Sequence, residues 1–121
     1  MSNMRDFAVG VYKGIDSMDV SRMAPFLSND CTLFFGNADV IKGREAITAY
    51  IGGFFNTIAG IRHDIADVWS VGHDLILRMT VTYTRKDRKE MTFPAAVIWA
   101  VHDGLITDFR IYVDNSPLFA P

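Results

Sequence analysis

The sequence predicts an α+β fold in which about three N-terminal helices pack on one face of an antiparallel sheet. Two features indicate this fold. Apolar residues recur at helical spacing through the first half of the chain, up to residue 58. After Gly60 the pattern changes to apolar runs joined by short polar turns, which is typical of a meander of antiparallel strands. A chain of 121 residues is the size of one domain, and we expect residues 1–121 to form a single one.

Three helices are expected before the meander. Residues 3–15 carry an apolar stripe along one side, which predicts a helix packed on another element. Ser17 or Asp19 can cap a second, short helix, whose length Pro25 limits. The third helix is expected after Gly43, where apolar side chains again recur at helical spacing.

The remaining segments alternate with the period of two that marks β-strands. Asp103-Gly104, between the last two runs, is a strong hairpin signal. The run from Phe93 to Val101 is apolar at both parities, and a sheet that is apolar on both faces needs two covers. Helices supply one cover and a second copy of the chain is the simplest candidate for the other, so we predict a homodimer through the sheet face. The expected strands are residues 31–35, 61–71, 75–84, 90–101 and 105–113.

Charge and hydropathy narrow the choice of partners. The chain has 12 Lys and Arg against 14 Asp and Glu, for a net charge of -2, and we expect no nucleic-acid partner. The densest basic run, residues 85–89, is interpreted as a solvated hairpin tip. No apolar run approaches the roughly 18 residues of a membrane span, and residues 1–14 lack the apolar core of a signal peptide. We therefore expect no membrane partner and a cytoplasmic location.

The sequence contains none of the common cofactor or metal motifs. Its three His are scattered, and its single cysteine, Cys31, is interpreted as buried packing rather than as a reactive thiol. Gly-rich phosphate loops, dinucleotide fingerprints and serine nucleophile elbows do not occur. We expect neither a metal nor a cofactor.

Three short phrases, in this order, resemble one superfamily. They are Gly-Arg-Glu-Ala-Ile at residues 43–47, Asp-Gly-Leu-Ile at residues 103–106 and the aromatic-rich stretch 106–118. They resemble the nuclear-transport-factor-two-like superfamily, and the last stretch looks most like its SnoaL-like, ketosteroid-isomerase-like branch. The resemblance implies a cone-shaped fold, usually dimeric, with an apolar pocket between the concave sheet face and the helices. Members include ketosteroid isomerases, polyketide cyclases, limonene epoxide hydrolases and proteins that only bind, so the fold does not fix the function.

Four residues are candidates for catalysis. Asp114 falls near the last-strand aspartate that serves as acid or base in SnoaL-type cyclases, and a carboxylate in an apolar pocket has a raised proton affinity. Tyr112 and Arg110 share its side of the strand and could orient a ligand oxygen or pair with Asp114. His63 could titrate near neutrality beside Asp114, with Asp67 as a tether. The alternatives are a turn cap for Asp114, a salt bridge for Arg110, packing for Tyr112 and a structural hydrogen bond for His63.

Aromatic side chains and one methionine are candidates for the pocket wall, where they would suit a flat or alicyclic ligand; packed core is the alternative. Tyr12 joins them because the oxyanion tyrosine of ketosteroid isomerases falls within one residue of it. The base aspartate of those enzymes is replaced by Phe34-Phe35, and their second acid by Ala96 or Val97, which argues against steroid isomerase chemistry. The wall candidates are Trp69, Trp99, Phe34, Phe54, Phe55, Met79 and Tyr12.

Three functions stay open at this point. The first is an enzyme without a cofactor that acts by acid–base catalysis, as an isomerase, cyclase or epoxide hydrolase, on a small apolar substrate. The second is a protein that binds a hydrophobic small molecule in the same pocket without turnover. The third is a dimerisation module whose pocket is packed core. A small apolar ligand and a second copy of the chain are the expected partners.

Overall fold

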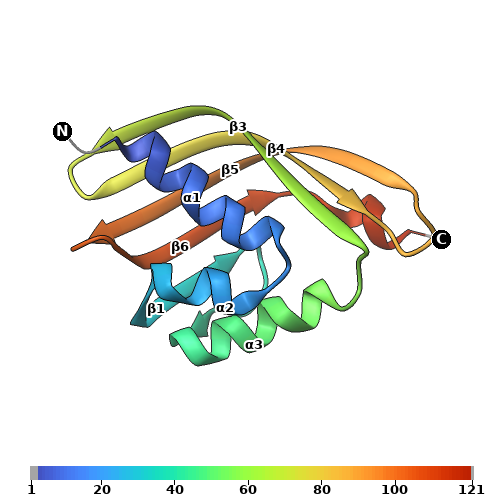
Figure 1. Cartoon of the computed structure of the whole chain (residues 1–121), viewed down its shortest axis with the longest axis horizontal. Coiled ribbons are helices and arrows are strands. Elements are labelled where there is room, and N and C mark those ends of the chain that lie inside the picture. The colour runs from blue at the N-terminus through green and yellow to red at the C-terminus, as the bar shows by residue number, and fades with distance from the viewer. Residues whose placement is uncertain (1–2, 121) are drawn as a thin grey trace.

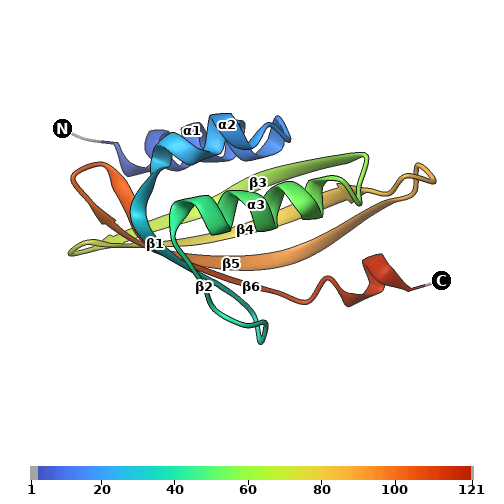
Figure 2. The ribbon, with the colours of Figure 1, turned by 90° about the horizontal axis from the view of Figure 1, so that it is seen from below.

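The three α-helices of the described residues lie on the same side of a curved sheet (Figure 1, Figure 2). The computed structural model describes residues 3–120. The predicted α+β fold, with helices before the meander, is confirmed. The helices of the described residues are α1 (Met4–Asp16), α2 (Val20–Met23) and α3 (Arg44–Phe55), with short 3-10 helices η1 (Ala24–Phe26) and η2 (Ser116–Phe119).

The sheet is mixed rather than wholly antiparallel. Its strands are β1 (Leu27–Phe35), β2 (Ile41–Lys42), β3 (Gly60–Val71), β4 (Asp74–Thr84), β5 (Glu90–His102) and β6 (Leu105–Val113). In residues 3–120 their order is β2-β1-β6-β5-β4-β3, and β3 to β6 form the expected antiparallel meander. β1 runs parallel to β6, because the chain leaves β1 through β2 and the crossover helix α3 rather than through a single hairpin.

Local chemistry fixes where α1 begins and how it packs. The side chain of Asn3 accepts hydrogen bonds from the backbone N–H groups of Arg5 and Asp6, which satisfies two donors of the first turn. Gly14 lies against α2, since a Cβ atom at this position would lie 2.5 Å from the backbone oxygen of Arg22. Close approach to α2 therefore fixes the C-terminal half of α1. The buried side of the helix carries Ala8, Val11, Tyr12, Gly14 and Ile15.

An extra residue in β3 changes which side chains face the helices. Ala66 has no partner in β4 and forms a bulge, after which the alternation of side chains changes phase. Asp67 and Trp69 therefore lie on the outer face, contrary to the expectations that Asp67 tethers His63 and that Trp69 lines the pocket wall. On that face, Asp67 forms an ion pair with Arg78, whose guanidinium also lies over the ring of Trp69.

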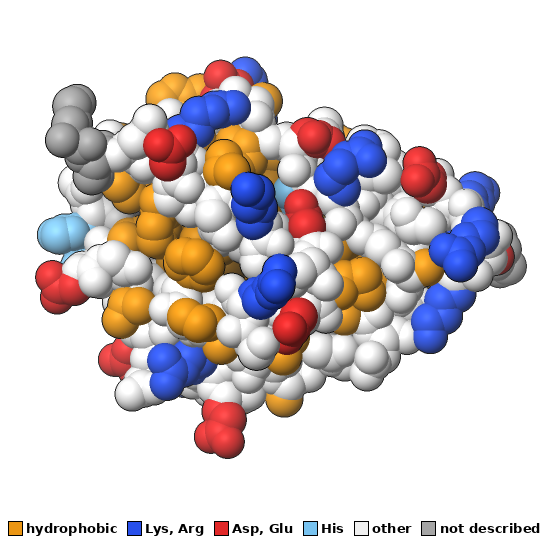
Figure 3. Space-filling model, viewed as in Figure 1, with side chains coloured by type: hydrophobic (Ala, Val, Ile, Leu, Met, Phe, Trp, Pro, Cys, Tyr) orange, Lys and Arg blue, Asp and Glu red, His pale blue; other side chains and the backbone are white. Residues whose placement is uncertain are grey.

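The face of the sheet under the helices forms the core. Trp99 is fully buried there, stacked on Tyr12 and in edge contact with Phe7 and Phe109. Lys and Arg side chains gather at the β4–β5 hairpin, residues 85–89, at one end of the molecule, where the solvated tip was expected (Figure 3). Among the helices of residues 3–120, none has the length and apolar character needed to cross a membrane.

Candidate functional site

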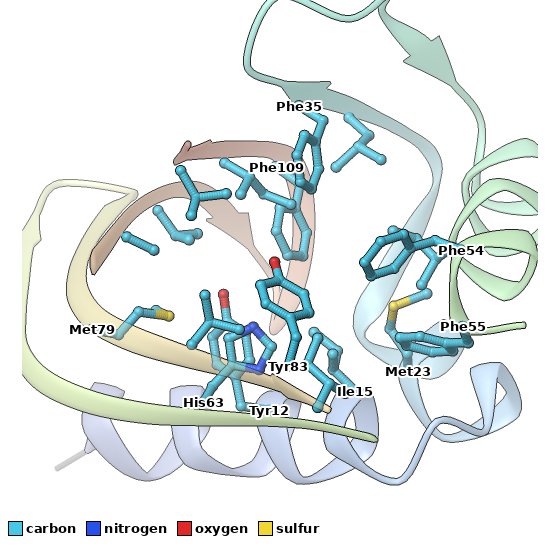
Figure 4. Close-up of a pocket in the computed structure, with 18 of the residues that line it drawn as sticks. Tyr12, Ile15, Met23, Phe35, Phe54, Phe55, His63, Met79, Tyr83 and Phe109 are labelled. Carbon is cyan, nitrogen blue, oxygen red and sulfur yellow. The ribbon is translucent and has the colours of Figure 1, made fainter. Parts of the chain in front are cut away.

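A cavity of about 60 Å³ lies between the helices and the inner face of the sheet (Figure 4). All three α-helices and strands β1, β3, β4, β5 and β6 contribute to its wall, which is mostly apolar. Among the described residues that line it, only Tyr12, His63 and Tyr83 carry a side-chain nitrogen or oxygen. A few polar groups in an apolar wall give a ligand with one polar end a defined orientation.

His63 enters the cavity from β3 and is anchored to Asp16, the last residue of α1. Nδ1 of its imidazole lies 2.6 Å from Oδ1 of Asp16, and its backbone N–H donates to Oδ2 of the same carboxylate at 2.9 Å. The side chains are 12% and 23% exposed, respectively, so the pair is partly shielded from water. An ionised carboxylate can only accept, which assigns the proton of this bond to Nδ1 and leaves Nε2 as the acceptor of the neutral ring. Within the described residues, Nε2 has no hydrogen-bond partner.

Tyr12 projects from α1 and lies against the imidazole. The two ring centroids are 4.4 Å apart, and the other side of the phenol ring stacks on Trp99 at 5.6 Å. Burial raises the pKa of the Tyr12 phenol far above its ordinary value, and the negative charge of Asp16 raises it further. The hydroxyl of Tyr12 is therefore a hydrogen-bond donor throughout the physiological pH range.

Tyr83 supplies a second hydroxyl from β4. Its oxygen accepts a hydrogen bond from the side-chain amide of Asn115 at 3.4 Å, and its ring makes an edge contact with Phe54 of α3. Burial raises the pKa of Tyr83 as well, so this phenol also stays protonated near neutrality. Figure 4 shows the hydroxyls of Tyr12 and Tyr83 and the ring of His63 on the same side of the cavity.

The site can therefore exchange protons and donate hydrogen bonds. His63 can accept a proton at Nε2 while Asp16 stabilises the imidazolium that forms, and the two phenols can donate to a ligand oxygen. Metal ligands are not clustered: within residues 3–120, no three His, Cys, Asp or Glu side chains come together as a group that could hold an ion.

Three of the four catalytic candidates do not face this cavity. Asp114, Tyr112 and Arg110 lie on the outer face of β6, because the helices cover the apolar face of this strand and leave the polar one outside. Asp114 accepts the backbone N–H of Ser116 at 3.1 Å, and hydrogen bonds from Ser116 lower its pKa. Arg110 pairs with Asp108 at 3.0 Å, and the ring of Tyr112 is 47% exposed. The expected placement of these three residues in the pocket is corrected.

The wall candidates divide in the same way. Tyr12, Phe54, Phe55 and Met79 line the cavity with His63, and their roles in binding stay predictions. The other three candidates do not line it. Trp99 is core beneath Tyr12, Trp69 lies outside because of the bulge in β3, and Phe34 lies on the outer face under the guanidinium of Arg110, 3.9 Å from the ring centroid.

Sequence reasoning missed Asp16 and Tyr83. Asp16 directly follows the predicted helix of residues 3–15, and α1 includes it, so its spacing of four from Tyr12 places both on one side of the helix. Tyr83 shares the parity of Met79 on a regular strand, which places both on the same face. Both residues could therefore have been found once Tyr12 and Met79 were assigned to the wall.

Helices over a curved sheet, enclosing a small apolar cavity with its polar groups on one side, define the ketosteroid-isomerase-like class of α+β pocket domains. The comparison with protein families agrees with this class. The model of the SnoaL-like domain matches residues 8–109, and the chain belongs to this family. Among curated proteins, none matches the sequence of this chain.

Solved structures show the same fold at low sequence identity. A nuclear-transport-factor-two-like protein of unknown function from Burkholderia pseudomallei is 17% identical, with a TM-score of 0.85 over 98% of this chain and 96% of the other. A protein of ketosteroid-isomerase-like fold from Catenulispora acidiphila, in complex with trimethylamine, is 14% identical, with a TM-score of 0.83 over 91% and 86%. An epoxide hydrolase from Mycobacterium tuberculosis, which is similar to limonene epoxide hydrolases, is 17% identical. Its TM-score is 0.80 over 94% of this chain and 84% of the other. These similarities establish the fold.

Proposed function

We propose that the cavity binds a small, mostly apolar molecule and that His63 moves a proton to or from the polar end of that molecule. The observation that carries this proposal is the double hydrogen bond from His63 to Asp16, which fixes the imidazole with its free Nε2 at the only polar part of the described wall. The pair has the form of a general base and the group that orients it.

The proton transfer uses residues of this chain alone. Nε2 of His63 removes a proton from the bound molecule, or from a water beside it, and the imidazolium that results is stabilised by Asp16 at 2.6 Å. Tyr12 and Tyr83 donate hydrogen bonds to the oxygen on which negative charge develops. A positioned acid–base group of this kind contributes about 10² to 10⁴ in rate.

Two of the similar structures support a small-molecule site without choosing the reaction. One was crystallised with trimethylamine, and one is an epoxide hydrolase. Proton removal next to a carbonyl and activation of water toward an epoxide both fit a histidine base. Binding without turnover is the alternative, because the cavity holds one acid–base residue rather than a pair of separate catalytic groups.

The test is a panel of small ketones and epoxides incubated with the protein in D₂O and followed by NMR. We expect exchange next to the carbonyl, or hydrolysis of the epoxide, to be about 100-fold slower in His63→Gln than in the wild type. His73→Gln is the matched control, since His73 lies in the β3–β4 turn away from the cavity. Binding without any turnover would favour the binding protein, and neither binding nor turnover would favour a dimerisation module.

The proposal includes a homodimer through the outer face of the sheet. The middle of this face, on β5, carries the small or apolar residues Pro94, Ala96 and Ile98, and Pro94 and Ala96 are exposed. Trp69 and Tyr112, both 47% exposed, flank them on the neighbouring parts of the sheet. Sedimentation at micromolar concentration is expected to give a dimer for the wild type and a monomer for Ala96→Arg. A wild-type monomer would contradict this part of the proposal.

A cytoplasmic location and the absence of nucleic-acid and membrane partners also stay proposals. Cys31 is a buried free thiol, which is compatible with a reducing compartment. Fractionation of cells that produce the protein tests the location, with recovery in the membrane fraction as the contrary result.

A further inference from the structure

We propose that the ligand of this cavity is a small methylated ammonium ion, held by aromatic rings and by the negative charge of Asp16. This inference rests on the binding part of the proposed function, because it names a class of molecule for the same cavity, with its polar end at Nε2 of His63. Four properties of the described wall support it: its rings, its charge, its size and its free hydrogen-bond acceptor.

Aromatic rings surround the cavity on several sides. They come from α1, β1, α3, β4 and β6, and Figure 4 shows them around a common open space. The face of an aromatic ring attracts a cation, and several rings together are the usual recognition site for methylated ammonium groups. The six rings are those of Tyr12, Phe35, Phe54, Phe55, Tyr83 and Phe109.

The charge of the site favours a cation over an anion. No Lys or Arg is among the described residues that line the cavity, and Asp16 lies directly behind His63. The charge of Asp16 is felt inside the cavity, since it is one of the causes that raise the pKa of Tyr12. A carboxylate or phosphate ligand would meet this negative charge without a cationic partner, whereas an ammonium ion would be stabilised by it.

The size of the cavity favours a small ligand over large ring systems. One water takes a share of about 30 Å³ in the liquid. The enclosed space of about 60 Å³ is therefore small, which favours a ligand of few atoms, such as a methylated ammonium ion. Steroids and polyketides need several times this space.

The polar wall matches an ammonium N–H. Asp16 holds the proton of the neutral imidazole on Nδ1, so Nε2 of His63 presents a lone pair at the cavity. A trimethylammonium ion can donate its single N–H to Nε2 while its methyl groups contact the rings. A tetramethylammonium ion has no such donor and keeps only the ring and charge interactions.

The test compares charged and neutral molecules of the same size. Trimethylammonium chloride, tetramethylammonium chloride and tert-butanol are titrated into the full chain by calorimetry, at constant ionic strength adjusted with sodium chloride. We expect trimethylammonium to bind most tightly and tert-butanol at least about tenfold more weakly than either cation. Equal affinity for tert-butanol and the cations, or preference for tert-butanol, would overturn the ligand class while leaving a small-molecule pocket. No binding of any of the three would overturn the ligand class, whereas the proposed function falls only if the ketones and epoxides of the first test also fail to bind and react.

Two variants separate the contributions of charge and rings. Asp16→Asn keeps an oxygen for His63 but removes the charge, and is expected to abolish the preference for cations over tert-butanol. Phe54→Leu removes one ring from the partly exposed part of α3, and is expected to weaken tetramethylammonium by about 3- to 10-fold while changing tert-butanol by less than about twofold. Thermal unfolding of each variant establishes that it is folded. Loss of affinity for the cation and for the alcohol to the same degree in Phe54→Leu would contradict a role for the ring.

Discussion

The carboxylate of Asp16 both orients the imidazole of His63 and pairs a backbone donor of β3. It accepts from the imidazole of His63 and from the backbone N–H of the same residue, on a strand that forms the edge of the described sheet. The first bond orients the candidate base, and the second covers a donor that the sheet leaves unpaired. Arg5, at the other end of α1, covers two carbonyl oxygens beside the bulge of the same strand, those of Ile65 and Ala66. The geometry of the site and the attachment of α1 to β3 therefore depend on the same contacts.

Removal of the charge of Asp16 tests this dependence. Asp16→Asn is expected to lower the free energy of unfolding by about 1.5–3 kcal/mol, because an amide has a single acceptor oxygen and one of the two charged hydrogen bonds from His63 is lost in a partly buried place. Urea unfolding at neutral pH measures the change. Asp39→Asn, in an exposed turn, is the control and is expected to stay within about 0.5 kcal/mol of the wild type. Equal effects of the two substitutions would show that the bonds of Asp16 do not stabilise the folded chain.

At the level of elements, α1 carries two glycines in different surroundings. Gly14 faces α2 so closely that a Cβ atom would lie 2.5 Å from the oxygen of Arg22, whereas a Cβ atom at Gly10 would meet only the ring of Phe26, at 3.9 Å. Both positions lie inside the same helix, so the two differ mainly in available space.

Alanine substitutions are expected to move stability in opposite directions. Gly10→Ala is expected to raise the free energy of unfolding by about 0.5–1 kcal/mol through helix propensity. Gly14→Ala is expected to lower it by about 1–3 kcal/mol, because α1 and α2 must separate. Denaturant unfolding of both variants gives the comparison, and stabilisation by Gly14→Ala would show that α2 does not approach α1 so closely in solution.

The periodic pattern of apolar residues predicts the helices and strands well. It predicts less well which face of a strand turns toward the helices. The meander and the helices follow from alternation and helical spacing, because those patterns are local. The choice of face on β6 is not local: the strand has an apolar and a polar side, and packing of the helices puts Ile111 rather than Asp114 in the cavity. One bulge at Ala66 reverses the faces of Asp67 and Trp69, and no residue pattern marks it. His63 lies before the bulge, so its side chain keeps the alternation of Ile61 and Ile65 and enters the cavity.

At the scale of the whole molecule, the buried thiol and phenol groups make the free energy of unfolding fall as the pH becomes alkaline. Cys31 is fully buried, and burial above all raises its pKa from 9.0 to about 12. The unfolded chain loses this proton near pH 9 and the folded chain keeps it. The contribution is therefore complete below pH 9 and is lost as the pH rises toward 12, at about 1.4 kcal/mol per pH unit. Tyr12 and Tyr83 act with the same sign at higher pH, since burial raises both pKa values.

Urea unfolding at about pH 8 and about pH 10 tests this coupling. The wild type is expected to lose about 2 kcal/mol over this interval, about 1.4 kcal/mol of it through Cys31 and the rest through Tyr12 and Tyr83. Cys31→Ala is less stable at pH 8 because it leaves a small void, yet its loss between the two pH values is expected to be clearly smaller. Equal losses in both proteins would show that the thiol does not keep its proton in the folded chain.

The pairing of β1 with β6 also affects the order in which the chain can fold during its synthesis on the ribosome. β1 is translated early, but the partner that covers one of its edges is the last strand of the sheet to emerge. Until β6 is made, the strand that joins β1 to β5 is missing, and the sheet remains in two parts. Such long-range pairing folds late and leaves a strand edge open in the nascent chain. In a growing polypeptide of this sequence, the edge of β1 that β6 covers therefore stays open until β6 has been synthesised.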